Sequence, residues 1–278
     1  MSRMLVTGVS GFLGGTLCRL AGEAGWQVRG TYFSRPVESS AGVRTVRLDL
    51  KDGSQAAGLI DRIRPEVVVH TAYSQKDREV TFQGTRRLAE ACASLEEKPY
   101  FIFISTDLIF DGKKGNYCEE DTPVPVLPYG RDKLEAEKAV RGTLAGSLVV
   151  RTSLMYDFAR VPGHLRFAVE AIRDGRDCTF FRDEFRSPVL VDELAGALLE
   201  LARMRPEGTL HLAGRDRLER FSFGRALLAA LGFSTGAVVA GSLEELGESR
   251  PADCSLDSSR AEGLLNLSFR GARETLGI

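Results

Sequence analysis

The sequence predicts an α/β protein built on a doubly wound parallel sheet, with a smaller α/β lobe toward the C-terminus. Short β-rich runs alternate with helical patterns through the first half of the 278 residues. The strand-like runs are continuously apolar, which is typical of parallel strands buried on both faces. A glycine-rich turn also joins the first strand to the first helix. These observations indicate repeated strand–helix–strand units.

The elements follow in order along the chain. The expected strands are 3–8, 26–33, 43–50, 66–72, 100–106 and 147–156, and the expected helices between them are 12–25, 54–65, 81–96 and one around Tyr129. Further on, helical patterns cover 164–175, 191–204 and 221–232, and strand patterns cover 178–191 and 208–214. Ser222 is the expected N-cap of the helix over 221–232. Residues 234–253 have no clear pattern.

Two lobes are expected in this chain. Residues 1–155 carry the regular alternation, whereas 156–278 follow a weaker pattern, with some segments returning to the first domain. A linker rich in proline, glycine and serine is missing between them. The second lobe is therefore expected to pack directly on the first.

Composition excludes several classes of partner and site. The formal net charge is −1 without long runs of one sign, which argues against nucleic acid and anionic membranes. The chain lacks an apolar stretch long enough to span a bilayer and a recognisable leader, so a cytoplasmic protein is expected. The five cysteines are scattered and form no Cys-x-x-Cys pattern, and the three histidines are far apart. Neither a disulfide framework nor a metal site is expected, and the histidines are interpreted as structural.

The glycine-rich turn has the spacing of a phosphate-binding loop. Gly8, Gly11 and Gly14 form T-G-x-x-G-x-x-G between the first strand and the first helix, which is the context a Rossmann-like dinucleotide site requires. Glycine permits the tight turn and the close approach of a pyrophosphate, and the helix N-terminus offers N–H groups and positive potential. The alternative is a purely structural turn.

The end of the second strand bears on the cofactor. NAD sites commonly place an acid there to bind the ribose hydroxyls. This chain has Ser34 and Arg35 instead, and the first later acid is Glu38. Arginine suits a 2′-phosphate, which a carboxylate would repel. The sequence favours NADP, with NAD as the alternative.

A set of polar residues beyond the fifth strand suggests redox chemistry. Thr106 ends an apolar strand at the edge where ligands bind in such sheets. Tyr129 and Lys133 follow four residues apart, on one face of the expected helix. An ammonium beside a phenol lowers the pKa of the phenol, which would let Tyr129 donate a proton to a carbonyl as hydride arrives. Thr106 would orient that carbonyl. Taken one at a time, each residue could equally be a cap, a packing residue or a solvated charge.

The sequence resembles an extended short-chain dehydrogenase/reductase, and within that group dTDP-4-dehydrorhamnose reductase. The resemblance rests on "TGVSGFLG", "RLDLKD", "STDLIFDGKKGNYCEEDTPVPVLPYGRDKLEAEK", "VVRTSLMY", "RSPVLVDELA" and "RPADCSLDSSR". It implies NAD(P)H-dependent reduction of a keto group on a nucleotide-linked deoxy sugar, which the second lobe would bind. It implies a catalytic set of Thr106, Tyr129 and Lys133. Positions that match cofactor-binding residues are Gly8, Ser10, Gly11, Phe12, Leu13, Gly14, Asp49, Leu50, Thr71, Ala72 and Tyr73, together with Tyr129 and Lys133.

The chain also departs from the family pattern. His70 stands where the family has Asn, Thr81 where a later Asn is expected, and Leu154 where an aromatic residue is expected. The loop after the fourth strand is shorter and less acidic than in relatives that form a metal-bridged dimer. No metal is therefore expected, and a homodimer stays open.

Two other functions remain open. One is a non-catalytic NADP-binding regulatory subunit, resembling the β subunit of methionine adenosyltransferase. The other is a sugar-nucleotide epimerase or a reductase of another carbonyl. For a substrate diphosphate the chain offers Arg151, Arg182, Arg186 and Arg250.

Overall fold

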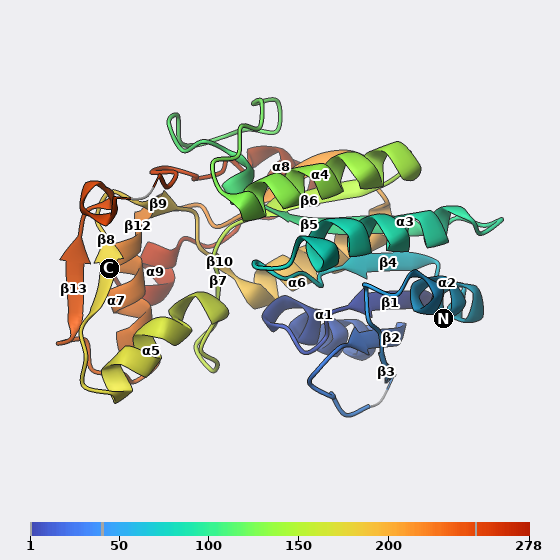
Figure 1. Ribbon diagram of the computed structural model, residues 1–278, viewed down its shortest axis with the longest axis horizontal. Helices are drawn as coiled ribbons and strands as arrows, with labels where there is room; N and C mark the ends of the chain where they lie inside the picture. Colours follow the sequence, from blue (N-terminus) through green and yellow to red (C-terminus); the bar gives the residue numbers. More distant parts are fainter. Residues whose placement is uncertain (1, 40–41, 248) are drawn as a thin grey trace. The chain divides into compact units, whose positions relative to one another are not determined.

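The computed structural model describes residues 2–39, 42–247 and 249–278. Within them, the main sheet has the strand order β11-β6-β5-β4-β1-β2-β3, of which Figure 1 labels the strands from β6 to β3. Its strands are β1 (Arg3–Thr7), β2 (Gln27–Tyr32), β3 (Val43–Arg47), β4 (Val67–His70), β5 (Tyr100–Thr106), β6 (Leu148–Thr152) and β11 (Gly208–Leu212). Strand β1 pairs in parallel with both β2 and β4. This order confirms the doubly wound fold, with its topological switch point between β1 and β4.

Helices separate the strands as the apolar periodicity predicts. They are α1 (Phe12–Glu23), α2 (Gly53–Ile63), α3 (Thr85–Ala93), α4 (Pro128–Thr143), α5 (Arg166–Arg173), α6 (Val191–Met204), α7 (Arg220–Ala230), α8 (Ser259–Leu265) and α9 (Ala272–Leu276). Short helical segments are η1 (Glu79–Gly84, π-helical), η2 (Asp107–Ile109), η3 (Gly163–Leu165) and η4 (Leu243–Leu246). None of the helices in the described ranges is long and apolar enough to cross a membrane.

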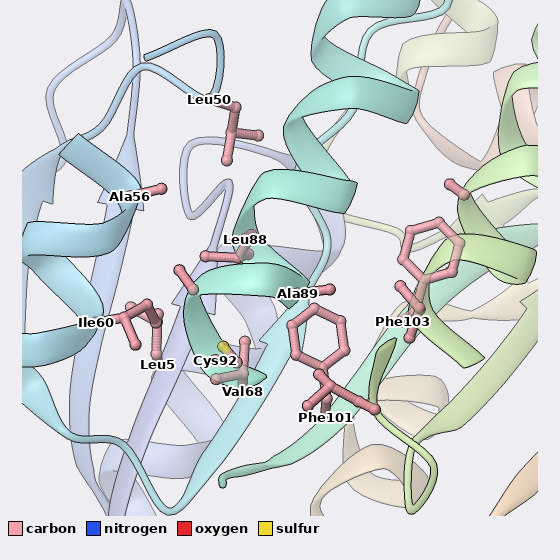
Figure 2. Packing of buried hydrophobic residues seen from close by; sticks show 14 of the residues in the cluster. Leu5, Leu50, Ala56, Ile60, Val68, Leu88, Ala89, Cys92, Phe101 and Phe103 are labelled. Carbon is pink, nitrogen blue, oxygen red and sulfur yellow. The ribbon is translucent and has the colours of Figure 1, made fainter. Parts of the chain in front are cut away.

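Both faces of the sheet are covered by apolar side chains. Leu5, Val68 and Phe101 share a buried cluster with residues of α2, α3 and α4 (Figure 2). Because successive strand residues point to opposite faces, Val6 and Val69 face the other side, and they too are completely buried. The central strands have apolar residues at consecutive positions because both faces of the sheet are covered.

The chain divides into two compact units that alternate along the sequence. The first comprises residues 1–105, 131–150 and 195–210, and the second comprises 106–130, 151–194 and 211–278. Each has its own apolar core: the cluster of Figure 2 lies in the first, and a cluster around Tyr156, Phe180 and Phe223 lies in the second.

The second unit is built from small strand pairs. Strand β7 (Met155–Tyr156) pairs in parallel with β10 (Val189–Leu190). Strand β8 (Cys178–Phe181) pairs in parallel with β13 (Val238–Gly241). Strand β9 (Phe185–Arg186) pairs antiparallel with β12 (Leu218–Glu219). Two long strands predicted from the sequence, 147–156 and 178–191, are therefore each broken into shorter ones.

Several element boundaries differ from those expected, and two of these differences concern residues singled out in the sequence. Helix α7 begins at Arg220 with Glu219 as its N-cap residue, so Ser222 lies inside the helix and is not its cap. Its hydroxyl instead donates to the Glu219 side chain. Strand β3 ends at Arg47, so Asp49 and Leu50 follow the strand. The unassigned stretch 234–253 contains β13, whose apolar residues become a strand only by pairing with β8.

Candidate functional site

The loops after β1 and β4 touch each other at the switch point. Gly8 follows β1 with φ of +75°, a left-handed conformation that glycine adopts without strain. A Cβ atom at this position would lie 2.9 Å from the Cα atom of Ala72, in the loop after β4. The hydroxyl of Thr71 donates to the Thr7 carbonyl at 2.6 Å. Glycine is therefore required at position 8 both by its backbone angle and by this contact.

The glycine loop, residues Gly8–Gly14, opens α1 as predicted. A Cβ atom on Gly14 would come within 2.4 Å of the Gly8 carbonyl oxygen, so the loop closes over a position without a side chain. Gly11 is the N-cap residue of α1, and its missing side chain leaves the first helical turn without a side-chain cap. Leu13 is buried, whereas Ser10 and Phe12 are half-buried. This glycine cradle at an uncapped helix N-terminus fits the diphosphate of a dinucleotide.

The other expected cofactor residues of this unit differ in exposure. Ser34 and Arg35 follow Phe33 just after the end of β2, and both are exposed. The carboxylate of Asp49 accepts the Lys51 N–H at 2.9 Å and so also caps a turn. Leu50 is buried in the core, where it packs against Gly84. Its side chain is held by that packing.

Lys133 is a buried cation in α4. Its side chain is 2 % exposed, and the ammonium nitrogen Nζ donates to the Ile104 carbonyl at 2.7 Å. Nζ lies 4.6 Å from the centre of the Phe103 ring and 5.2 Å from that of Tyr73. Burial lowers the pKa of Lys133 to about 7, and the Glu137 carboxylate one turn further along the helix opposes this shift. The loop after β4 thus reaches Lys133 through the exposed ring of Tyr73.

Tyr129 and Thr106 lie at the ends of their elements. Tyr129 is the second residue of α4 and half-buried, one helical turn before Lys133. Thr106 ends β5 and is buried. Its hydroxyl donates to Asp107 at 3.2 Å and accepts the Leu108 N–H at 3.3 Å. Close packing fixes the start of the helix, because a Cβ atom on Gly130 would lie 2.1 Å from the Leu108 carbonyl oxygen.

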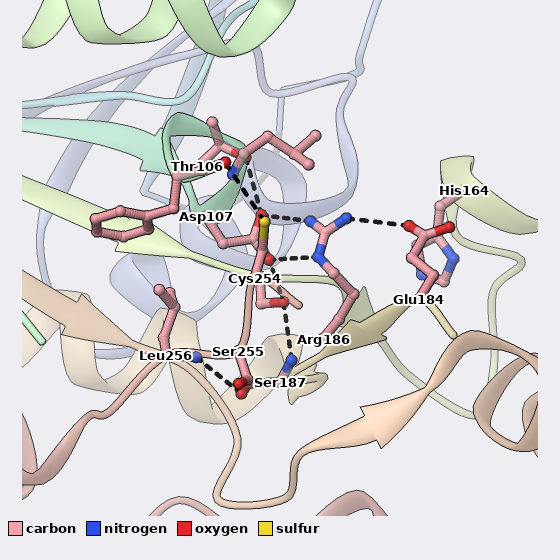
Figure 3. A network of polar contacts seen from close by, with 12 residues as sticks. Thr106, Asp107, His164, Glu184, Arg186, Ser187, Cys254, Ser255 and Leu256 are labelled. Carbon is pink, nitrogen blue, oxygen red and sulfur yellow. Dashed lines mark hydrogen bonds and ion pairs between the residues drawn. The ribbon is translucent and has the colours of Figure 1, made fainter. Parts of the chain in front are cut away.

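A buried ion network follows Thr106 within the second unit (Figure 3). Asp107 is fully buried and forms a two-pronged ion pair with Arg186, whose Nε donates at 2.6 Å. Ser153 also donates to Asp107, at 2.6 Å. Burial alone would lower the pKa of Arg186, but the negative groups around it, Asp107 foremost, raise it instead. The network holds the residue next to Thr106 from two directions.

Two of the four arginines singled out in the sequence share a carboxylate, and the other two have different neighbours. Arg186 and Arg250 both contact the buried carboxylate of Glu184, at 3.7 Å each. Arg151 lies over Phe110 and next to His211. Arg182 is exposed and lies over Phe221.

Sequence reasoning missed two members of this network. Glu184 has only 4 % of its surface exposed, and Arg220 lies 3.9 Å from it. Burial lowers the pKa of Arg220 to about 10, which Glu184 opposes. Glu184 and Arg220 each stand next to an apolar run in the sequence, and this position is the signal that could have predicted their burial.

His70 and His211 are completely buried, and His164 is half-buried. Burial lowers the pKa of His70 and His164 to about 3 and that of His211 to about 4, and a nearby cation acts in the same direction on each. In the described part of the chain, histidine, cysteine and carboxylate side chains do not gather in any group of three able to hold a metal ion.

The family assignment comes from a match over nearly the whole chain. The sequence model of the RmlD substrate binding domain matches residues 2–277. The chain belongs to this family. A crystal structure of a hypothetical dTDP-4-dehydrorhamnose reductase from Sulfolobus tokodaii is 32 % identical, with a TM-score of 0.81 and 96 % of each chain covered. The expected resemblance to dTDP-4-dehydrorhamnose reductases is thereby confirmed.

Two further relatives and one further solved structure are similar to this chain over most of its length. A probable low-salt glycan biosynthesis reductase, Agl14, from Haloferax volcanii is 29 % identical over 95 % of this chain and 92 % of its own length. Methionine adenosyltransferase 2 subunit beta from Danio rerio is 26 % identical over 96 % of this chain and 85 % of its own length. The dTDP-4-dehydrorhamnose reductase from Bacillus anthracis, crystallised with NADP, shares the fold with a TM-score of 0.81 at 22 % identity, over 100 % and 98 % of the two chains.

Proposed function

We propose that this RmlD-family protein is an NADPH-dependent reductase of a keto group on a nucleotide-linked deoxy sugar. The relatives named as reductases, from Sulfolobus tokodaii and Haloferax volcanii, support the reaction class. The NADP complex of the Bacillus anthracis neighbour supports the cofactor, as does the exposed Arg35 after β2, with NAD as the alternative. The similarity to dTDP-4-dehydrorhamnose reductases supports a sugar nucleotide as the substrate.

The buried ammonium of Lys133 carries this proposal. Burying a lysine against Phe103, with the Ile104 carbonyl as acceptor, destabilises the folded protein. A charged group buried at such a cost is a candidate for a functional role. It lies one turn after Tyr129 in α4. Its positive charge favours the phenolate form of a neighbouring tyrosine, which makes the phenol a better acid.

Each proposed catalytic residue has one task in this reaction. The bound nicotinamide supplies the hydride for the keto carbon. Tyr129 donates its phenolic proton to the keto oxygen as the alkoxide forms, and Lys133 stabilises the phenolate that is left. Thr106 orients the keto oxygen by turning its one hydroxyl proton from Asp107 toward that oxygen, while the Leu108 N–H still donates to the hydroxyl oxygen.

The test is NADPH oxidation with a dTDP-4-keto-6-deoxy sugar. Tyr129→Phe removes only the acidic proton, so we expect its turnover to fall by about a hundredfold or more while NADPH binding persists. Tyr100→Phe is the matched control, because the Tyr100 hydroxyl bonds to the Pro206 carbonyl at the opposite end of β5. Equal turnover by wild type and Tyr129→Phe would rule out the acid role.

The β-subunit relative favours a second candidate function. It aligns with 96 % of this chain at 26 % identity. This similarity supports a regulatory subunit that binds NADP and docks on a partner enzyme. NADPH binding without turnover on a panel of keto sugars, together with a co-purifying partner, would favour that function. An epimerase is distinguished by the absence of net NADPH oxidation, because it regenerates its cofactor.

A further inference from the structure

A buried histidine connects the two loops at the switch point of the sheet. His70 is the last residue of β4 and has no exposed surface. Its ring nitrogen Nδ1 lies 2.6 Å from the Thr7 hydroxyl at the end of β1. Its other ring nitrogen, Nε2, lies 2.9 Å from the Thr85 hydroxyl at the start of α3. The imidazole therefore bridges β1 and α3 from the strand between them.

The neighbouring bonds fix the direction of this bridge. The Thr85 hydroxyl donates its proton to the Thr81 carbonyl at 2.6 Å, so it can only accept from His70 Nε2. Nε2 must then carry the proton, which leaves Nδ1 of the neutral ring as an acceptor for the Thr7 hydroxyl. The Thr7 oxygen in turn accepts the Ala72 N–H at 3.2 Å. Every donor in this chain of bonds has one acceptor.

The same chain of bonds holds the loop after β4 at both ends. At one end Thr7 binds the Ala72 N–H. At the other end the Thr81 hydroxyl accepts the Ser74 N–H at 2.9 Å and donates to the Ser74 carbonyl at 2.6 Å. His70 is the link between these two anchors. The loop it fixes packs against the glycine loop and places Tyr73 over Lys133.

The surroundings of His70 require a neutral ring. It stacks on Phe103 with ring centres 5.8 Å apart, and its partners on β1 and α3 are the uncharged Thr7 and Thr85. The charged group that acts on it is the Lys133 ammonium of α4. A proton on Nδ1 would replace the acceptor of the Thr7 hydroxyl with a second donor and add a second buried cation beside Lys133. Protonation would therefore break the bridge.

We propose that His70, as the neutral ring with its proton on Nε2, is a positioning residue that preorganises the Thr71–Ser74 loop for binding the nicotinamide cofactor. This inference rests on the proposed cofactor but not on the sugar substrate. A fixed loop loses less conformational freedom when the ligand binds, and that raises affinity. His70 touches neither reacting atom, so its effect should fall on cofactor affinity rather than on the chemical step.

The first test uses the cofactor-free protein. Nitrogen-15 NMR of the His70 ring should show a protonated Nε2 and an unprotonated Nδ1 that do not change between pH 5 and 8. Hydrogen exchange should show protected amides at Ala72 and Ser74. A ring protonated on Nδ1, or fast exchange of both amides in wild type, would overturn the proposal. Because this test contains no cofactor, it stands even where the proposed function fails.

The second test measures the dissociation constant for NADPH in variants. His70→Leu removes both bonds, and we expect about tenfold weaker binding and loss of protection at Ala72. His70→Asn retains an acceptor toward Thr7 and should restore affinity to within about threefold of wild type. His164→Leu is the matched control, because it removes another neutral histidine, half-buried, from the second compact unit. It should lower stability without changing NADPH affinity.

If His70→Leu does not fold, Thr7→Val tests the same hydrogen bond from its other side. It removes only the hydroxyl and should weaken NADPH binding as much as the loss of the imidazole does. Where His70→Leu folds, combining it with Thr7→Val should add little, since both changes remove the bond between His70 and Thr7. Wild-type NADPH affinity in folded Thr7→Val or His70→Leu would overturn the proposal. A wild type that binds no NADPH would instead reject the proposed cofactor, and the two failures are thus separable.

Discussion

At the scale of single residues, Lys133 is a charged side chain that is almost completely removed from water. A lysine that is 2 % exposed loses most of its hydration, and one carbonyl and two aromatic rings replace only part of it. The folded protein retains such a group at a cost in stability, which is expected where a charge serves catalysis rather than folding.

This cost makes the stability of the cofactor-free protein depend on pH. The pKa of Lys133 is about 7 in the folded protein and near its ordinary value of 10.5 in the unfolded chain. The penalty is therefore fully present below pH 7 and is relieved as the pH rises from 7 toward 10. Lys133→Met lacks the penalty, so it should be more stable than wild type at pH 6. Its advantage should shrink by about 1.4 kcal/mol per pH unit above 7.

Urea unfolding of both proteins between pH 6 and 9 measures this difference. Subtracting wild type from variant removes the contribution of other groups, including the buried cysteines, whose pKa values burial raises. A stability difference that stays constant over this range would contradict a depressed pKa for Lys133.

The sequence alone predicted the role of some site residues but not of others. Gly8 and Gly14 could be predicted because a tight turn and a close backbone approach both exclude side chains. The pairing of Asp107 with Arg186 could not, because it joins residues 79 apart in the chain. Leu50 matched a cofactor position, yet its side chain fills the core, since burial depends on partners such as Gly84 that only the fold supplies.

At the scale of elements, the turn from β1 into α1 tolerates no added side chain. Gly14→Ala would bring a Cβ atom to 2.4 Å from the Gly8 carbonyl oxygen, so the glycine loop must move. We expect a loss of about 1–3 kcal/mol in the free energy of unfolding, together with weaker NADPH binding. Gly58→Ala in α2 is the matched control. Nothing lies within 4 Å of its added Cβ atom, and it should gain about 0.5–1 kcal/mol.

Chemical denaturation and NADPH titration of both variants provide the measurement. Gly14→Ala with wild-type stability and affinity would show that the close contact with Gly8 relaxes without consequence. If Gly58→Ala does not stabilise the protein, the expected gain from helix propensity is absent at that position. The effect of Gly14→Ala would then be compared with wild type alone.

Long apolar elements were predictable, and short ones were not. Strand β5 and helix α4 each carry enough periodic sequence to be found alone. Strands β7 and β10 have two residues each, and they exist because they pair with each other across more than thirty positions of chain. The start of α7 was also misplaced, because Glu219 rather than a capping serine precedes the helix.

At the scale of the whole molecule, the compact units do not correspond to two halves of the chain. The first unit needs residues 195–210, which contain most of α6 and the start of β11. A fragment of residues 1–155 therefore lacks an outer strand and a helix of that unit. Buried residues such as Leu148 and Val150 of β6 would lose the neighbouring strand.

We expect the 1–155 fragment to unfold without cooperativity and to bind NADPH far more weakly than the full chain. Circular dichroism during thermal unfolding and a fluorescence titration with NADPH measure both properties, with the full chain as control. Cooperative unfolding and full affinity in the fragment would instead support a self-sufficient domain ending near residue 155.

The π-helical segment Glu79–Gly84 also constrains how this region can change in length. An α-helical residue turns the chain by about 100°, so deleting one position here would rotate Thr81 away from Ser74 relative to the helix that follows. Thr81 could then no longer bind Ser74 while Thr85 keeps its hydrogen bond to His70. Insertions and deletions among homologous chains should therefore accumulate between Ser74 and Asp77, before the wide turn begins, and spare the turn itself.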